Sequence, residues 1–577
     1  MEGKVAADYA ARAGAVVAPK TRARPHLSAR DRSLMPTPVS DRYQQLVGKI
    51  NAAIRAGDLD QAGLFAEQAL QSGPELPQLL FLAGHRRLQM QQAGPAAELL
   101  ERARSLAPGD QNVLNALGIA LRQVGRLAES RAVLETVTSL YPDNASAHFN
   151  KGAVLEDLGD LDAAERAYRA AVGAQPNFAD ALARLSYLTA LRGDRNEAAK
   201  LASQAGQASS EGASEQDHLL AFTLARAEVE AGNFKAGLSR LNKVVASATP
   251  PLRASMNGLI GDCYEGLGNS SAAFDHYVKS KSELRSIFAP RFVRPDVEPF
   301  LAQVQRLEAF FVEQAPSWRG EEKAPSPVLG HAFLVGFPRS GTTLLETALG
   351  SHPAIVTTEE RQTLDEAVRD FIQPKNGLER LANADRDELS RYREFYWARI
   401  REGSPEIEGK MVLDKLPLNI TFLGLIAKLF PNARVLFAIR DPRDCVFSSF
   451  RHIFAMNIAM YEFCTLDGAA HLYDAVMRLA DVYRAKLALP LMETCYERSV
   501  TDFEGSMRTI VDFLGVPYDE RVMDFKERAL SRPMTTPSGQ QLARGLYNGA
   551  GQWRAYETQM APVLPILEPW VRRFGYL

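Results

Sequence analysis

The chain divides into two parts by the spacing of its hydrophobic residues. Up to about residue 285, apolar and small residues recur at a fixed long step that is typical of stacked helix pairs. Beyond residue 330, short apolar runs such as Arg434–Ile439 alternate with helical segments. Short buried runs indicate strands, and strands that alternate with helices predict a parallel sheet. We therefore expect an α-helical N-terminal part followed by an α/β C-terminal part.

The N-terminal part repeats with a period of 34 residues. The residues that keep this step are prolines and two sets of glycines: Pro74, Pro108, Pro142 and Pro176; Gly84, Gly118 and Gly152; Gly125, Gly159 and Gly193. A 34-residue period is the signature of the tetratricopeptide repeat, a helix–turn–helix unit that buries its apolar face against its neighbours. We predict an α-solenoid over residues 41–285, with a concave face suited to an extended peptide or protein partner.

Other segments flank the predicted solenoid. Residues 1–40 are basic and rich in alanine, and we predict a disordered arm there. Residues 286–330 contain several prolines and are predicted to be a linker. The remaining residues, 331–577, form the predicted α/β domain.

The most informative stretch of the α/β domain runs from His331 to Glu360. Its apolar run predicts a buried strand, which a glycine-flanked loop, Gly336–Gly341, joins to a helix that begins at Thr342. Backbone N–H groups of such a loop and of the first helical turn lack internal partners, and the helix dipole adds partial positive charge. The sequence therefore predicts a cradle for a phosphate or sulfate group.

The composition of this loop excludes an ordinary ATP site. A nucleoside-triphosphate P-loop carries a lysine that reaches the β- and γ-phosphates, and Thr342 stands at that position here. The cation is instead Arg339, inside the loop. We interpret the stretch as a P-loop relative without the ATP-hydrolysing lysine, which disfavours a P-loop kinase.

Further basic and polar residues follow the other predicted strands. Lys415, Arg440 and Tyr496 each stand at or just beyond a strand end, where ligands bind in a parallel sheet. We expect them to converge with Arg339 on one crevice. Ser448 lies on the helix after Arg440, so a guanidinium fork and a hydroxyl can meet on a second phosphate.

The motif PRSGTT resembles the 5′-phosphosulfate loop of sulfotransferases, whose donor is 3′-phosphoadenosine 5′-phosphosulfate (PAPS). The longer stretch from PRSGTTLLE through HP to EE is most similar to the protein-tyrosine sulfotransferase branch, and the whole chain resembles a bacterial tetratricopeptide-repeat sulfotransferase. The resemblance implies a 3′-phosphate site at Arg440 and Ser448, with Tyr496 near the nucleotide. It also implies that the donor's 5′ end is bound by Pro338, Arg339, Ser340, Gly341, Thr342 and Thr343.

The same resemblance assigns catalytic roles. Glu360 matches the second glutamate of the family's GEETR segment and would take the acceptor proton, with Glu359 as the competing base. Arg339 and Lys415 would stabilise charge on the transferring group, and Ser538 matches a serine that assists the bridging oxygen. The chain departs from the family at Gln552: the family has a basic residue directly before the tryptophan, and this chain has a glutamine. Arg544 and Arg554 are the alternatives for the role of that basic residue.

Composition narrows the remaining choices. The 577 residues are 46% hydrophobic and 24% charged with a net charge of −2, which argues against a general nucleic-acid binder. No apolar run approaches the length of a membrane span. The cysteines lack paired or metal-like spacing, so we expect reduced thiols, no metal and a cytoplasmic location. These cysteines are Cys263, Cys445, Cys464 and Cys495.

Three functions remain open. The first is a PAPS-dependent sulfotransferase whose repeats present a peptide or protein tyrosine. The second is the same enzyme acting on a carbohydrate or a small hydroxyl compound, and the third is a non-catalytic repeat scaffold with a relic sulfotransferase domain. Because every predicted donor contact lies downstream of Pro290, the repeats are expected to select the acceptor and not the donor.

Overall fold

The computed structural model describes residues 41–158, 160–192, 194–208, 215–314, 318, 320, 326–531 and 549–577. The chain forms two compact units, Met1–Leu185 and Ser186–Leu577. The break lies within the repeat region, so the second unit contains the last repeats together with the α/β domain. The predicted arm, residues 1–40, lies outside the described residues.

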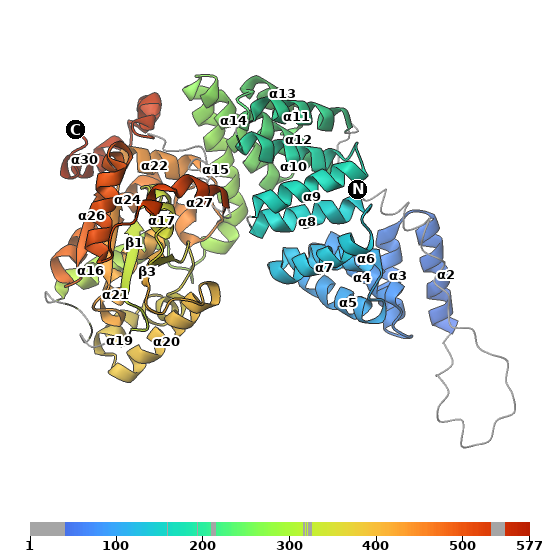
Figure 1. Cartoon of the computed structure of the whole chain (residues 1–577), viewed down its shortest axis with the longest axis horizontal. Coiled ribbons are helices and arrows are strands. Elements are labelled where there is room, and N and C mark those ends of the chain that lie inside the picture. The colour runs from blue at the N-terminus through green and yellow to red at the C-terminus, as the bar shows by residue number, and fades with distance from the viewer. Residues whose placement is uncertain are drawn as a thin grey trace, which may run out of the picture. The chain divides into compact units, whose positions relative to one another are not determined.

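The first unit is built from antiparallel helix pairs (Figure 1). Its helices are α2 (Asp41–Arg55), α3 (Leu59–Leu70), α4 (Pro77–Gln89), α5 (Ala93–Leu106), α6 (Gln111–Gln123), α7 (Leu127–Leu140), α8 (Ala145–Leu158) and α9 (Leu161–Ala174), and α10 (Ala179–Leu191) spans the break. A Cβ atom on Gly118 would lie 2.6 Å from Leu134, and one on Gly152 would lie 2.6 Å from Tyr168. The repeating glycines therefore allow the two helices of a unit to approach closely.

The second unit begins with further helices of the same kind. They are α11 (Arg195–Ala208), α12 (Glu215–Glu230), α13 (Phe234–Val244), α14 (Pro250–Gly266) and α15 (Ser270–Phe292), and α16 (Phe300–Glu313) follows. Gly261 of α14 faces the ring of Tyr277 of α15, in the same relation as the glycines of the first unit. Paired repeat helices thus continue directly into the unit that contains the sheet, and the predicted helical solenoid is confirmed.

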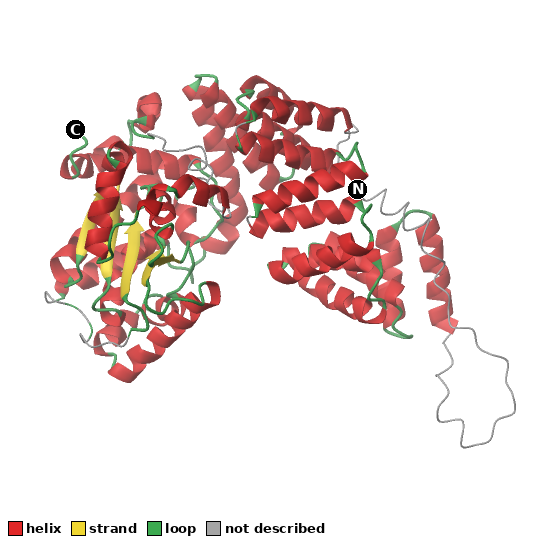
Figure 2. Cartoon of the chain, in the orientation of Figure 1, coloured by secondary structure: helices red, strands yellow, loops and turns green. Residues whose placement is uncertain are grey.

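The α/β domain is organised around a parallel sheet, drawn in yellow in Figure 2. Its strands are β1 (Gly330–Gly336), β2 (Ile355–Thr357), β3 (Met411–Lys415), β4 (Arg434–Ile439) and β5 (Leu491–Cys495), in the order β2-β3-β1-β4-β5. In the register of the central strand, Ala332 lies beside Leu413 on one side and Arg434 on the other. The parallel α/β prediction is confirmed, and all strand carboxyl ends meet at one edge.

Helices cover both faces of the sheet because its strands are apolar on both sides. Phe333 and Val335 pack into one core cluster, whereas Ala332 and Leu334 pack into another, as strand alternation requires. The first cluster includes residues of α16, α18 (Asp365–Phe371), α19 (Gly377–Asn383), α20 (Arg386–Gly403), η2 (Pro417–Phe422), α21 (Leu423–Leu429), α22 (Pro442–Arg451), α23 (Ile458–Glu462), α24 (Leu466–Lys486), η4 (Gln552–Tyr556), α29 (Glu557–Met560) and α30 (Leu564–Arg573). The second includes residues of α17 (Thr342–Gly350), α26 (Phe503–Leu514), η3 (Glu520–Met523) and α27 (Phe525–Ser531).

Within the ranges described above, no helix combines the length and the apolar character needed to cross a membrane.

Candidate active site

The loop between β1 and α17 has the geometry of an anion cradle. Gly341 stands at the N-cap of α17 with φ +95° and has no side chain to cap the helix, so the first N–H groups are left for a ligand. A Cβ atom there would lie 2.5 Å from the ring of Tyr496. One on Gly336 would lie 2.6 Å from the carbonyl oxygen of Ala438. Both glycines are therefore required by close packing at the loop.

Arg339 occupies the left-handed region of backbone space, with φ +73°, and turns its guanidinium toward α22. Its Nε donates to Ser448 Oγ at 3.0 Å, and its NH2 donates to His452 Nε2 at 3.3 Å. A guanidinium can only donate, so His452 carries its proton on Nδ1, which donates to the Ser448 carbonyl at 3.1 Å. Burial, followed by the charge of Arg339, holds the pKa of His452 well below its usual value. The loop arginine and the predicted 3′-phosphate serine are thus brought together.

Arg440 lies beside this cluster at the end of β4. Its NH1 donates to the carbonyl oxygen of Arg339 at 3.1 Å, its NH2 donates to that of Gly549 at 2.6 Å, and its guanidinium lies 4.8 Å from the ring centroid of Tyr496. Its buried Nε has no partner within the described ranges. Burial, with the charges of Arg440 and Arg451, lowers the pKa of Arg339 to about 9. An anion bound here would remove that electrostatic penalty.

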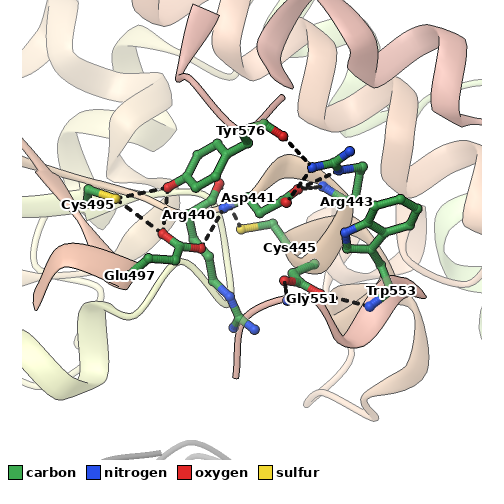
Figure 3. Close-up of polar contacts among 10 residues, drawn as sticks. Arg440, Asp441, Arg443, Cys445, Cys495, Glu497, Gly551, Trp553 and Tyr576 are labelled. Carbon is green, nitrogen blue, oxygen red and sulfur yellow. Dashed lines mark hydrogen bonds and ion pairs between the residues drawn. The ribbon is translucent and has the colours of Figure 1, made fainter. Parts of the chain in front are cut away.

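The turn from β4 into α22 is fixed by the carboxylates shown in Figure 3. Asp441 caps α22 and accepts from Arg443 at 2.7 Å, while its backbone N–H donates to Glu497 Oε1 at 3.2 Å. Glu497 in turn accepts from the hydroxyl of Tyr576 at 2.6 Å. Arg440 therefore leaves the sheet from a turn whose backbone is held by several ionic hydrogen bonds.

A second anchor fixes the segment around Gln552, where the chain departs from the sulfotransferase pattern. Asp444 is buried and accepts from the backbone N–H of Gly551 at 2.6 Å and of Trp553 at 2.9 Å. The guanidinium of Arg443 lies 4.3 Å from the ring centroid of Trp553. Arg554, one of the two alternatives named from the sequence, lies 5.3 Å from the same ring centroid, so two guanidinium groups place positive charge against this tryptophan.

Lys415 ends β3 and is 1% exposed. Its ammonium contacts Glu360 Oε1 at 2.8 Å and Glu346 Oε2 at 3.1 Å. Burial by itself lowers the pKa of Lys415, but the two carboxylates outweigh it and the net shift is upward. Glu346 is buried on α17, whereas the Glu360 side chain is 42% exposed and can meet an incoming group. The sequence prediction named Lys415 and Glu360 but missed Glu346, although it stands within PRSGTTLLE.

The segment that carries the two candidate bases is held at both ends by one buried carboxylate. Asp414 accepts from the hydroxyls of Thr358 at 3.0 Å and Thr363 at 2.6 Å. Between these anchors Glu359 adopts φ +45°, so the backbone bends at the first of the two candidate bases. Burial raises the pKa of Asp414, and its three hydroxyl donors, which include Tyr396 at 2.9 Å, oppose the shift.

The remaining predicted residues fall as follows. The carbonyl of Pro338 accepts from Ser449 at 3.3 Å, and Ser340 is buried with its hydroxyl unpartnered among the described residues. Thr342 and Thr343 are the first two residues of α17. Ser538 and Arg544 lie outside the described residues.

Comparisons with known proteins agree with this architecture. Residues 332–520 match the model of the Sulfotransferase family, and residues 115–177 and 222–280 match the tetratricopeptide repeat. The chain therefore carries tetratricopeptide repeats and a sulfotransferase-family domain, and the repeats suggest interactions with other proteins.

Individual relatives are distant. The chain is 28% identical over 246 residues to an uncharacterised protein of Aquifex aeolicus, an alignment that covers 41% of this chain and 32% of that protein. It is 26% identical over 208 residues to protein-tyrosine sulfotransferase 1 of Danio rerio, covering 34% and 56% of the two chains. The Drosophila melanogaster protein-tyrosine sulfotransferase is 26% identical over 217 residues, covering 36% and 42%. The alignments thus span a third to somewhat over half of each relative.

Among solved structures, a tetratricopeptide repeat protein from Parabacteroides merdae aligns with a TM-score of 0.34 and 17% identity, covering 42% of this chain and 94% of that one.

The C-terminal domain resembles protein-tyrosine sulfotransferases as a distant homologue.

Proposed function

We propose that the protein is a sulfotransferase that moves the sulfuryl group of PAPS to a hydroxyl acceptor, with a peptide or protein tyrosine held by the repeats as that acceptor. The observation that carries the proposal is the adjacency of two cation sites, at Arg339 and at Arg440, together with the Lys415–Glu360 pair, whose glutamate acts electrostatically on Arg339. A donor with phosphate at both its 3′ and 5′ positions matches such a pair of sites. The hydroxyl of Ser340 and the Nε of Arg440, neither of which has a partner among the described residues, supply further donors.

In the proposed reaction, Glu360 accepts the proton of the attacking hydroxyl. The acceptor oxygen forms a bond to sulfur while the bond from sulfur to the bridging oxygen breaks, and 3′-phosphoadenosine 5′-phosphate leaves. The loop N–H groups, Arg339 and Lys415 stabilise the negative charge that moves onto the leaving phosphate. By analogy with phosphoryl transfer, positioning and charge stabilisation account for most of the catalysis.

The donor assignment predicts nucleotide selectivity. We expect 3′-phosphoadenosine 5′-phosphate to bind the full-length protein at least about tenfold more tightly than ADP, since one charge-assisted contact to the 3′-phosphate contributes about 1.5–3 kcal/mol. Binding should not require Mg²⁺. Isothermal titration calorimetry with and without chelator measures the affinities and their dependence on Mg²⁺. Adenosine 5′-phosphate is the comparison ligand, because it lacks only the 3′-phosphate. Equal affinities for 3′-phosphoadenosine 5′-phosphate and adenosine 5′-phosphate would refute the assignment.

The acceptor is proposed from the resemblance to protein-tyrosine sulfotransferases and from the repeats. A screen with sulfur-labelled PAPS separates the alternatives: tyrosine peptides, the same peptides with phenylalanine, oligosaccharides and a simple phenol. We expect label on tyrosine peptides, none on the phenylalanine peptides, and slower transfer to the free phenol because it lacks contacts with the repeats. Transfer confined to oligosaccharides would favour the carbohydrate enzyme. Donor binding without transfer to any acceptor would favour the scaffold.

A further inference from the structure

The last helix pair of the repeat region packs directly against α22, the helix that carries Ser448. Both lie in the second compact unit, and α15 is in contact with α22 (Figure 1). The rings of Phe274 and Phe450 lie 5.5 Å apart, and a Cβ atom on Gly258 would lie 3.1 Å from Ile453. The repeats therefore form part of the packing that holds the predicted 3′-phosphate helix.

Ionic contacts reinforce this packing at the C-terminal end of α22. Arg451, its last residue, pairs with Glu265 at the end of α14. Glu265 also accepts from the hydroxyl of Tyr556 at 3.1 Å. Burial by itself lowers the pKa of Arg451. The acidic groups around the guanidinium, led by Glu265, have the larger effect, and the net shift of the pKa is upward.

Lys281 of α15 makes the contact that reaches furthest into the site. It is 2% exposed, and its ammonium donates to the backbone carbonyl of His452. No carboxylate pairs with Lys281 in the described part of the chain; the ring of Phe454 lies 6.0 Å away. Burial lowers the pKa of Lys281 to about 8, opposed by the neighbouring Cys464. Burying a lysine ammonium without a carboxylate partner destabilises the folded state, because the charge loses its hydration. A role other than packing would explain why the lysine is buried here.

The residue that Lys281 holds is the one whose ring contacts the loop arginine. His452 Nε2 accepts from Arg339, and His452 Nδ1 donates to the carbonyl of Ser448. The contacts form one continuous path from α15 through the His452 backbone to its ring and on to the Arg339 guanidinium. A displacement of the His452 backbone would move the ring, and with it the acceptor that orients Arg339.

We propose that Lys281 is a positioning residue for donor binding, acting through His452 on Arg339. The inference rests on the proposed function, because it concerns the affinity of that same site. It revises the expectation that the repeats leave donor binding untouched: the last helix pair contributes to the donor side, although all predicted donor contacts lie downstream of it. Binding of a partner that shifts α15 would then change donor affinity.

The test compares variants of the full-length protein. Lys281→Met removes the ammonium, Lys281→Arg keeps a buried donor, and Lys279→Met is the matched control, an exposed lysine two residues away on the same helix. Calorimetry gives the Kd for 3′-phosphoadenosine 5′-phosphate, and steady-state assays give separate KM values for donor and acceptor. We expect Lys281→Met to raise the nucleotide Kd and the donor KM by about tenfold, the effect of losing one hydrogen bond to a charged group.

In the same assays Lys281→Arg should recover most of the donor affinity, and Lys279→Met should match the wild type. The acceptor KM should stay constant in all three, which a general loosening of the fold would not produce. His452→Leu removes both ring contacts, to Arg339 and to the Ser448 carbonyl, and leaves the backbone carbonyl that Lys281 contacts; it tests the same path if Lys281→Met does not fold. Unchanged nucleotide Kd in a folded Lys281→Met, or in His452→Leu, overturns the proposal. A wild-type protein that binds no nucleotide instead contradicts the proposed function itself.

Discussion

Glutamine in place of Glu360 is expected to lower kcat by about 10²–10⁴-fold, the usual size of the loss of a general base. A phenol has a pKa of about 10 and needs a base to lose its proton at neutral pH. The glutamine amide oxygen can still accept from Lys415, which Glu360 contacts at 2.8 Å, so the cation should keep its place. Donor affinity should therefore change little. Steady-state turnover on one acceptor, with nucleotide titration in parallel, measures both quantities.

The matched control is Glu359→Gln. Glu359 precedes Glu360 on the same clamped segment, but its φ of +45° gives it a different orientation from that of an extended strand residue. We expect less than a tenfold effect on kcat, because it is Glu360 that pairs with Lys415 at the end of β3. A dead Glu359→Gln beside a healthy Glu360→Gln would show that the first glutamate is the base. Two healthy variants would place the base elsewhere and weaken the proposed tyrosine chemistry.

Alanine at Arg339 and at Arg440 is expected to separate chemistry from binding. Truncating a buried, hydrogen-bonded arginine at a binding site costs about 2–5 kcal/mol, which is roughly 30-fold to several thousand-fold in donor affinity. Arg339→Ala should raise the donor KM and lower kcat, because the loop arginine also meets the transferring group. Arg440→Ala should raise the donor KM and leave kcat close to that of the wild type.

The structure requires a sharper comparison for Arg440, since its guanidinium also holds the carbonyls of Arg339 and Gly549. Loss of these contacts weakens every ligand of the loop, whereas loss of a 3′-phosphate contact weakens only ligands that carry this phosphate. The preference for 3′-phosphoadenosine 5′-phosphate over adenosine 5′-phosphate should therefore collapse in Arg440→Ala and persist in Arg339→Ala. Arg508→Ala, at an exposed pair on α26, is the control and should match the wild type. An intact preference in Arg440→Ala would sink the 3′-phosphate assignment.

Local patterns in the sequence were enough to predict the sheet and its functional edge. Apolar runs located the strands, and in a parallel sheet their carboxyl ends must share an edge, so Lys415 and Arg440 could be placed without coordinates. Tyr496, expected at or just beyond a strand end, directly follows β5, which ends at Cys495.

Long-range contacts escaped prediction for a physical reason. Glu346 has the spacing of an ordinary helix residue, and only the approach of β3 to α17 gives it Lys415 as a partner. Lys281 would be expected on a solvated face, because lysine is almost never buried without a pairing partner. The contact that buries it joins residues 171 positions apart in the chain. No local pattern carries that information.

The two carboxylates that contact the buried Lys415 affect the timing of charge in the proposed reaction. While Glu360 is ionised, two negative groups compensate a single ammonium, and Lys415 offers little net attraction to another anion. When Glu360 takes the acceptor proton, it becomes neutral and one of these two compensating charges disappears. The ammonium is then released to the leaving phosphate at the moment when negative charge develops there. The contact between Lys415 and Glu360 would thus couple proton removal to electrostatic stabilisation of the leaving phosphate. Before an acceptor has bound, Lys415 would attract the negative charge of that phosphate less strongly.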